Sequence, residues 1–256
     1  MNISLAPEIL GHLGSFPITN TLVIAWILIA VFLVLVLLLR AKPFRQVPTG
    51  LQNLFEFAIE KLMNMVMSVT QDRARAAKFF PIVATIFLFV FFSNLVEIVP
   101  GLGTVGLHVM KHGEVELVPF IRSSSADLNM TFAIALVAVF SVQFLGIGVL
   151  GIKEYAGKFF IPPWKKPYGI GTFVGLLELI AEFAKIISFA FRLFGNIFAG
   201  EVLLMVMLFM VPYLVPLPFL FLEIFVGFIQ ALVFSMLTLV FLTMATTSHH
   251  EVEAHH

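Results

Sequence analysis

The chain has 256 residues, of which 60% are hydrophobic and only 12% charged. Soluble domains carry about 25% charged residues, so this composition excludes a water-soluble globular protein and indicates a chain that crosses a membrane several times. Basic and acidic residues balance at 15 each, which gives no sign of nucleic-acid binding. The absence of cysteine excludes disulfides, thiolate metal sites and a cysteine nucleophile.

The N-terminal part of the chain predicts two membrane helices with an amphipathic segment between them. The first apolar run, 21–39, is about 28 Å long as a helix, which matches one hydrocarbon core. Within 49–78, apolar residues recur at helical spacing between charged ones, a pattern typical of a helix on the membrane surface. The run 79–100 predicts the second membrane helix, and polar residues interrupt it only near its end.

The C-terminal part predicts a third membrane helix and a long hairpin. Asp127, or a serine before it, is placed to cap the apolar run 128–152. The segment 171–211 has 41 residues without a proline, about 60 Å as a helix, or twice the hydrocarbon thickness. The prolines of 212–218 then predict a turn into a last helix, 219–245.

These elements predict an all-α polytopic protein that forms a single membrane domain, 1–256. It has four to five membrane helices, an amphipathic surface helix and a tilted C-terminal hairpin. Basic residues predict its orientation, because segment 40–78 holds seven and loop 153–166 four, whereas loop 101–127 holds two. The positive-inside rule puts the first two in the cytoplasm, the N-terminus outside and the C-terminus inside. No transit peptide is seen, so we expect the bacterial plasma membrane.

Polar residues inside the apolar runs are the candidate functional residues, because they are costly in lipid. Arg192 lies about midway along 171–211 and keeps its proton in proteins, so it is a fixed positive charge. Helical spacing gives it a face of small or short polar residues. They are Ser188, Gly195, Asn196 and Ala199. Small residues alone indicate tight packing against another helix, whereas a charge among them favours a partner that offers carboxylates.

Carboxylates lie on both sides of Arg192. Glu178 and Glu182 precede it, toward the predicted cytoplasmic side. Glu201 follows it and reaches the depth of Glu223 when the hairpin folds back, so we expect the two to share a proton. The alternative is that these acids are protonated packing residues. Two acid groups with a fixed cation between them suggest two half-paths for protons that do not connect directly.

Three further polar residues extend the group formed by Glu201 and Glu223, on the predicted outer side of the membrane. Gln230 shares a helix face with Glu223, while Asn94 and Glu97 end an outward-going helix. For Glu97 and Asp127, near the membrane edge, a solvated end or a cap is an equal alternative.

The segment FRLFGNIFAGE (191–201), with Glu223, Gln230 and the ending LVFLTMA, resembles the a subunit of bacterial F-type ATP synthases. The segments SNLVEIVPG (93–101) and SADLNMT (125–131) occur in the same order in that family, so the resemblance covers most of the chain. It implies the stator half of a proton channel, beside a rotating ring of c subunits that carry membrane carboxylates. It also implies b subunits and, through them, the catalytic head as partners.

The resemblance implies roles for the matching residues. Arg192 would be the essential arginine that faces the ring. The outer half-channel would be lined by Asn196, Glu201, Glu223 and Gln230. The cytoplasmic exit would pass Glu178 and Ser188. The chain would translocate protons in the lipid bilayer without being catalytic alone, and without a cofactor or metal.

Two other classes of membrane protein fit the sequence less well. An ion-coupled secondary transporter with an intramembrane Arg/Glu site is the alternative, but its paired broken helices and internal repeats are missing. A membrane-embedded hydrolase needs a nucleophile–base pair or metal ligands, and all seven histidines lie outside the apolar runs.

Overall fold

The computed structural model describes residues 7–41, 50–99, 105–111, 114–159, 170–211 and 214–247. Within them, five helices are long and apolar enough to cross a membrane, so the predicted α-helical polytopic class is confirmed. These helices are α1 (Asn20–Ala41), α3 (Arg73–Ile98), α4 (Leu128–Leu150), α6 (Ile170–Met210) and α7 (Pro216–Thr246).

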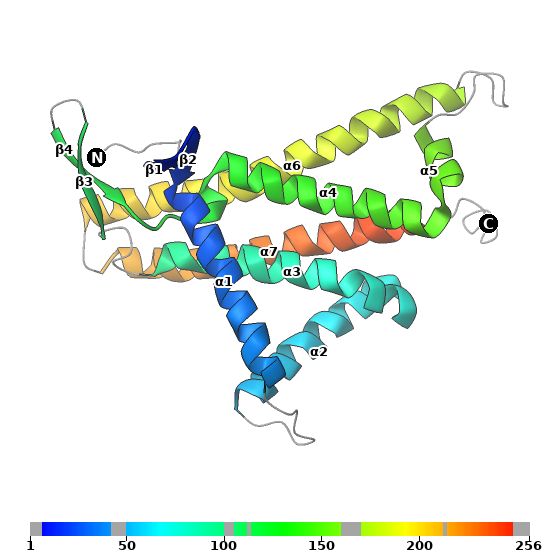
Figure 1. The fold of residues 1–256 in the computed structure, drawn as a ribbon, viewed down its shortest axis with the longest axis horizontal. Helices are drawn as coiled ribbons and strands as arrows, with labels where there is room; N and C mark the ends of the chain where they lie inside the picture. Colours follow the sequence, from blue (N-terminus) through cyan, green and yellow to red (C-terminus); the bar gives the residue numbers. More distant parts are fainter. Residues whose placement is uncertain are drawn as a thin grey trace.

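Four of these helices form the body of the molecule. Figure 1 shows α3, α4, α6 and α7 side by side along the long axis, whereas α1 leans away and α2 (Leu51–Thr70) returns toward the start of α3. We call the end where α6 turns into α7 the hairpin end. The opposite end carries a short helix that the sequence did not predict, α5 (Ile152–Phe159), and we call it the α5 end.

Two β-hairpins lie at the hairpin end, in segments where no strand was expected (Figure 1). The strands β1 (Ile9–Leu13) and β2 (Phe16–Thr19) pair antiparallel across a turn that contains Gly14, whose φ of +66° suits glycine. The strands β3 (Gly106–Lys111) and β4 (Glu114–Pro119) form the second antiparallel pair.

The core between the four helices combines aromatic rings with alanines. The rings of Phe189 on α6 and Phe234 on α7 have centroids 4.7 Å apart. The alanines let the helix backbones approach closely, and all are fully buried. They are Ala135, Ala138, Ala190 and Ala231. A second cluster, which includes Val66, Phe79 and Leu242, joins α2 and α3 to the end of α7.

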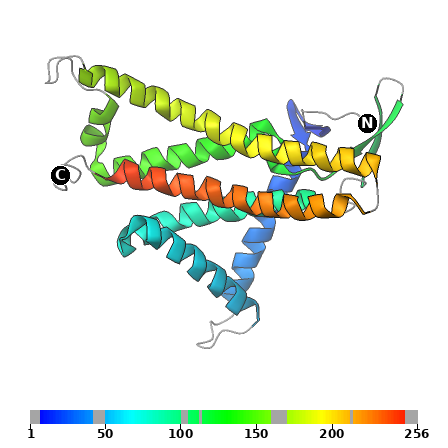
Figure 2. The same ribbon diagram turned by 180° about the vertical axis from the view of Figure 1, so that it is seen from behind.

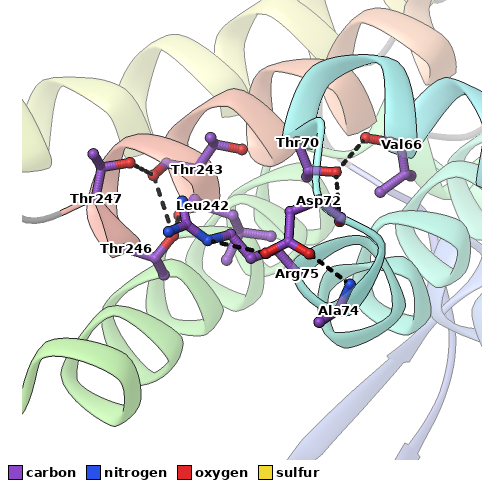
Figure 3. Close-up of polar contacts among 9 residues, drawn as sticks. All are labelled: Val66, Thr70, Asp72, Ala74, Arg75, Leu242, Thr243, Thr246 and Thr247. Carbon is purple, nitrogen blue, oxygen red and sulfur yellow. Dashed lines mark hydrogen bonds and ion pairs between the residues drawn. The ribbon is translucent and has the colours of Figure 1, made fainter. Parts of the chain in front are cut away.

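The corner between α2 and α3 explains why α3 begins at Arg73 and not at the predicted boundary of 79. Gln71 adopts a left-handed conformation (φ 51°) and its N–H bonds the Met67 carbonyl at 2.9 Å, which ends α2. Asp72 then caps α3 by accepting a hydrogen bond from the backbone N–H of Ala74 at 2.8 Å. Figure 3 shows this corner beside the threonines that end α7.

A buried polar cluster ties the helices together at the hairpin end. Asp127 caps α4, as predicted, with one carboxylate oxygen on a first-turn N–H at 2.9 Å. Its other oxygen accepts a hydrogen bond from the Thr21 hydroxyl of α1 at 2.8 Å. The Ser123 hydroxyl donates to the Ser93 carbonyl of α3 at 3.0 Å. The segment that precedes α4 is therefore anchored to both α1 and α3.

Candidate functional site

Arg192 lies on a face of α6 that no other part of the described chain covers. The residues of this face are exposed, whereas the opposite face, with Leu193 and Ile197, is buried in the core. The exposed residues are Ser188, Arg192, Gly195, Asn196 and Ala199. A Cβ added at Gly195 would meet nothing within 4 Å. Among the described residues, the stripe of small residues is therefore not packed tightly against another helix, and Asn196 alone of these five forms a side-chain hydrogen bond with α7.

The guanidinium of Arg192 has little to neutralise it. Its Nη2 donates a hydrogen bond to the Ser188 hydroxyl at 3.3 Å. Among the residues that the structure describes, no carboxylate contacts it. The fixed positive charge thus stands on an open face midway along a 41-residue apolar helix, a costly position if it faced lipid.

One helical turn toward the hairpin end, Asn196 connects α6 to α7. Its side-chain amide donates a hydrogen bond to the Gln230 carbonyl oxygen at 2.7 Å. Gln230 is only 4% exposed, and its Nε2 has no partner among the described residues. The structure thus brings together two of the predicted outer-path residues and leaves one with free hydrogen-bonding capacity.

Another turn further on, Glu223 of α7 packs against Gly200 of α6. A Cβ at Gly200 would overlap the Glu223 carboxylate, so this position of the side chain requires that residue 200 be glycine. Glu223 is 5% exposed, and its Oε1 has no hydrogen-bond partner in the described chain.

Glu201 is paired with a cation that sequence analysis did not select. Arg122, in the segment before α4, donates from Nη2 to the Glu201 Oε2 at 2.8 Å and from Nε to the same oxygen at 3.3 Å. Because Glu223 contacts the neighbouring Gly200, the two acids lie at similar levels. Within the described residues, their carboxylates form no hydrogen bond with each other. Glu201 is paired with Arg122, whereas Glu223 lies against Gly200.

Asn94 brings α3 to the same region. Its side chain is 2% exposed and its amide donates to the Gly227 carbonyl of α7 at 3.1 Å. Its Oδ1 is the third buried polar atom without a partner in the described chain, beside those of Glu223 and Gln230. Glu97 is in the last turn of α3, but its side chain lies outside the described residues.

Toward the α5 end, an open groove of about 280 Å³ runs along α6 and α7 and reaches Arg192. Ser188 lines it, as does Lys185, which sequence analysis did not select. The Lys185 ammonium lies 4.5 Å from the ring centroid of Phe241 and 2.6 Å from the Glu182 carboxylate. Helical spacing signals this lysine, because it shares a face of α6 with Glu182 and Arg192.

A chain of hydrogen bonds holds Glu182 from the other side. The Gln143 amide of α4 donates to Glu182 at 2.8 Å, and the Tyr155 hydroxyl of α5 donates to the Gln143 carbonyl oxygen. Burial, together with the charges of Glu182 and Glu178, raises the pKa of Tyr155 to about 12. The phenol therefore stays neutral and remains a donor. Gln143 is visible in the sequence as a polar residue in an apolar run, whereas nothing local marks Tyr155.

The chain matches the family model described as ATP synthase A chain over residues 22–243. ATP synthase subunit a of Campylobacter jejuni subsp. jejuni (serotype O:23/36, strain 81-176) is 33% identical over 219 residues, which cover 86% of this chain and 87% of that protein. ATP synthase subunit a of Helicobacter pylori (strain Shi470) is 35% identical over 221 residues, 86% of each chain. The matched range contains Arg192, the groove beside it and the buried polar residues Asn94, Glu223 and Gln230, and the chain therefore belongs to the ATP synthase A chain family.

Proposed function

We propose that this chain is the proton-translocating stator subunit of an F-type ATP synthase membrane sector, in which Arg192 separates two half-paths and faces a rotating c-ring. The observation that carries the proposal is the uncovered face of α6 around Arg192. An arginine keeps its charge and is costly in lipid, so this face needs a partner that presents carboxylates at mid-membrane. A ring of c subunits, each with a membrane carboxylate, meets that requirement.

The outer half-path runs from the hairpin end to Arg192 along polar residues of α3, α6 and α7. It passes Glu97, Asn94, Glu201 and Glu223, and then Gln230 and Asn196. Three of these residues keep a buried polar atom without a partner in the described chain. Such atoms are rare in purely structural interiors, whereas a route for protons needs polar groups that exchange partners.

The inner half-path follows the open groove toward the α5 end. The groove is bordered by Ser188 and Lys185, and Glu182 reaches it through Lys185. Glu178 lies further along the same helix, on the α5 side. An open groove admits water, and water carries protons to and from a ring carboxylate without a chain of buried groups.

Arg192 acts as the barrier between the two half-paths. A proton that passed directly along α6 would approach a permanent positive charge at low dielectric, which is strongly unfavourable. Net transport then depends on the ring carboxylates, which take a proton at one half-path and release it at the other. The chain is not catalytic by itself, since ATP chemistry belongs to the head that b subunits hold.

The orientation that fits this scheme places the hairpin end outside and the α5 end in the cytoplasm of a bacterial cell. The chain contains no cysteine, so single cysteines are informative. We expect a cysteine at the exposed Val105 to react from outside and one at the exposed Lys153 to react from the cytoplasm. Reaction from the opposite sides would reverse the orientation.

The test of the function is ATP-driven proton pumping in inverted vesicles. Arg192→Ala is expected to abolish pumping in complexes whose assembly is verified by co-purification. Arg192→Lys is also expected to fail, because an ammonium loses its proton when desolvated and lacks the planar fork. Arg40→Ala, at the end of α1, is the matched control and retains pumping. Normal pumping by an assembled Arg192→Ala complex would refute the proposal.

A further inference from the structure

The ion pair between Arg122 and Glu201 joins a loop to a membrane helix across 79 positions of sequence. Both donor contacts from the guanidinium end on the same carboxylate oxygen, at 2.8 and 3.3 Å. The Arg122 side chain is 9% exposed and that of Glu201 is 20% exposed. Each charge of this largely buried ion pair depends on the other, because removing either residue leaves the remaining charge poorly solvated.

The segment that carries Arg122 is held firmly. The neighbouring Ser123 donates to the Ser93 carbonyl of α3 and accepts a hydrogen bond from the Ser125 N–H at 3.2 Å. Asp127, further on, accepts from Thr21 of α1. The guanidinium is therefore presented to α6 from a fixed point, and it sets where the Glu201 carboxylate lies.

We propose that Arg122 is a positioning residue of the outer half-path, which holds the Glu201 carboxylate at the hairpin end while Glu223 stays free to exchange partners. This inference rests on the proposed function, because it assigns Glu201 to the proton route. The two acids differ in this respect: Glu201 is bound by a permanent cation, whereas Glu223 sits against Gly200 with a partnerless oxygen in the described chain. Without Arg122, the Glu201 carboxylate would lose both its position and its counter-charge.

The test is a double-mutant comparison in complete complexes. The variants are Arg122→Gln, Glu201→Gln and the two together, and the readout is passive proton conductance per assembled complex in inverted vesicles stripped of the catalytic head. We expect Arg122→Gln to lower conductance by about tenfold, a change that lies within the range of coupling energies between residues in contact. The double variant should be no worse than the poorer single variant. Arg122→Lys, which keeps the charge, should recover part of the conductance.

The control is Arg75→Gln, which removes another arginine paired with a carboxylate, Asp72, at 3.5 Å near the α5 end (Figure 3). It should leave conductance per complex unchanged. If Arg122→Gln prevents assembly, the contact is tested by exchanging the two residues, in Arg122→Glu with Glu201→Arg. Better assembly of this double variant than of Arg122→Glu alone supports the contact. No improvement in assembly overturns it. Wild-type conductance in Arg122→Gln, with Glu201→Gln impaired, overturns this inference alone. Wild-type conductance in Glu201→Gln removes Glu201 from the proposed route itself.

Discussion

The two halves of the α6–α7 hairpin, on either side of Arg192, differ in where their polar side chains lie. Toward the hairpin end, the two helices stay close, and polar groups face each other inside the contact, as Asn196 and Gln230 do. Toward the α5 end, the helices separate (Figure 2), and polar groups border an open groove. The difference teaches that one helix pair forms both a close polar contact and an open groove, depending on the spacing of its backbones.

Glycines of α6 allow a close contact in each half. At Gly200 the missing side chain makes room for Glu223, so a buried acid fits between closely packed helices. At Gly175 the missing side chain lets the backbone of α5, at Phe159, touch α6. The first glycine lets α7 approach α6 closely, whereas the second lets α5 contact the start of α6 from another side.

The largest expected difference between the halves is in the response to removing an acid. Glu223→Gln is expected to lower passive proton conductance per assembled complex by at least about tenfold, because no water-filled space substitutes for a buried titrating group. Glu182→Gln, the matched change beside the open groove, should have a much smaller effect. Equal losses at both positions would show that the two halves do not differ in access to water.

A smaller loss is expected when space in the closed half is filled. In Gly200→Ala the new methyl group displaces the Glu223 carboxylate, so conductance should fall several-fold, and overpacking of this kind costs about 1–3 kcal/mol of stability. Gly148→Ala on α4 is the control, because a Cβ there meets nothing within 4 Å. The measurement is conductance together with the midpoint of thermal disassembly. Unchanged values in Gly200→Ala would contradict the tight contact.

The smallest expected effect is on stability at alkaline pH, and it concerns the α5 end of the hairpin. Tyr155→Phe removes the donor to Gln143, which should cost about 1 kcal/mol near neutral pH. Because the pKa of Tyr155 is raised from 10.0 to about 12, the folded state keeps this proton longer than the unfolded state does. Its stabilising contribution is therefore complete below pH 10 and is lost as the pH rises toward 12. Thermal midpoints of wild type and variant should converge over that range, and a constant difference would argue against the phenol as the cause.

The sequence predicts those parts of the site that lie on one helix, because spacing of 3.6 residues defines a face. The exposed stripe around Arg192 follows from that spacing, and Lys185 was available from the same reasoning. The hairpin turn also makes the levels of Glu201 and Glu223 predictable, since chain length from the turn fixes depth.

The contacts made by loops and by the short helix α5 could not be predicted from the sequence. Arg122 appeared only as one of the few basic residues of an outer loop, because its partner is 79 positions away and only the anchored serines direct it there. Tyr155 lies on a short helix whose position depends on close backbone contact at Gly175. Such contacts depend on tertiary packing, which no local pattern encodes.

The length of α6 has a mechanical consequence. It runs for 41 residues without a proline, and neighbouring segments hold it on either side of its middle, through hydrogen bonds from Gln143 to Glu182 and from Arg122 to Glu201. Arg192 lies between these two contacts. If the proposed rotor turns against Arg192, its sideways load would act on a helix that the core backs at Leu193 and Ile197 and that polar contacts hold on either side. Part of the load would pass to α4 and to the anchored loop before it. Resistance to torque at the centre of the membrane would thus depend on the packed core behind Arg192 and, in addition, on two polar contacts that lie away from it.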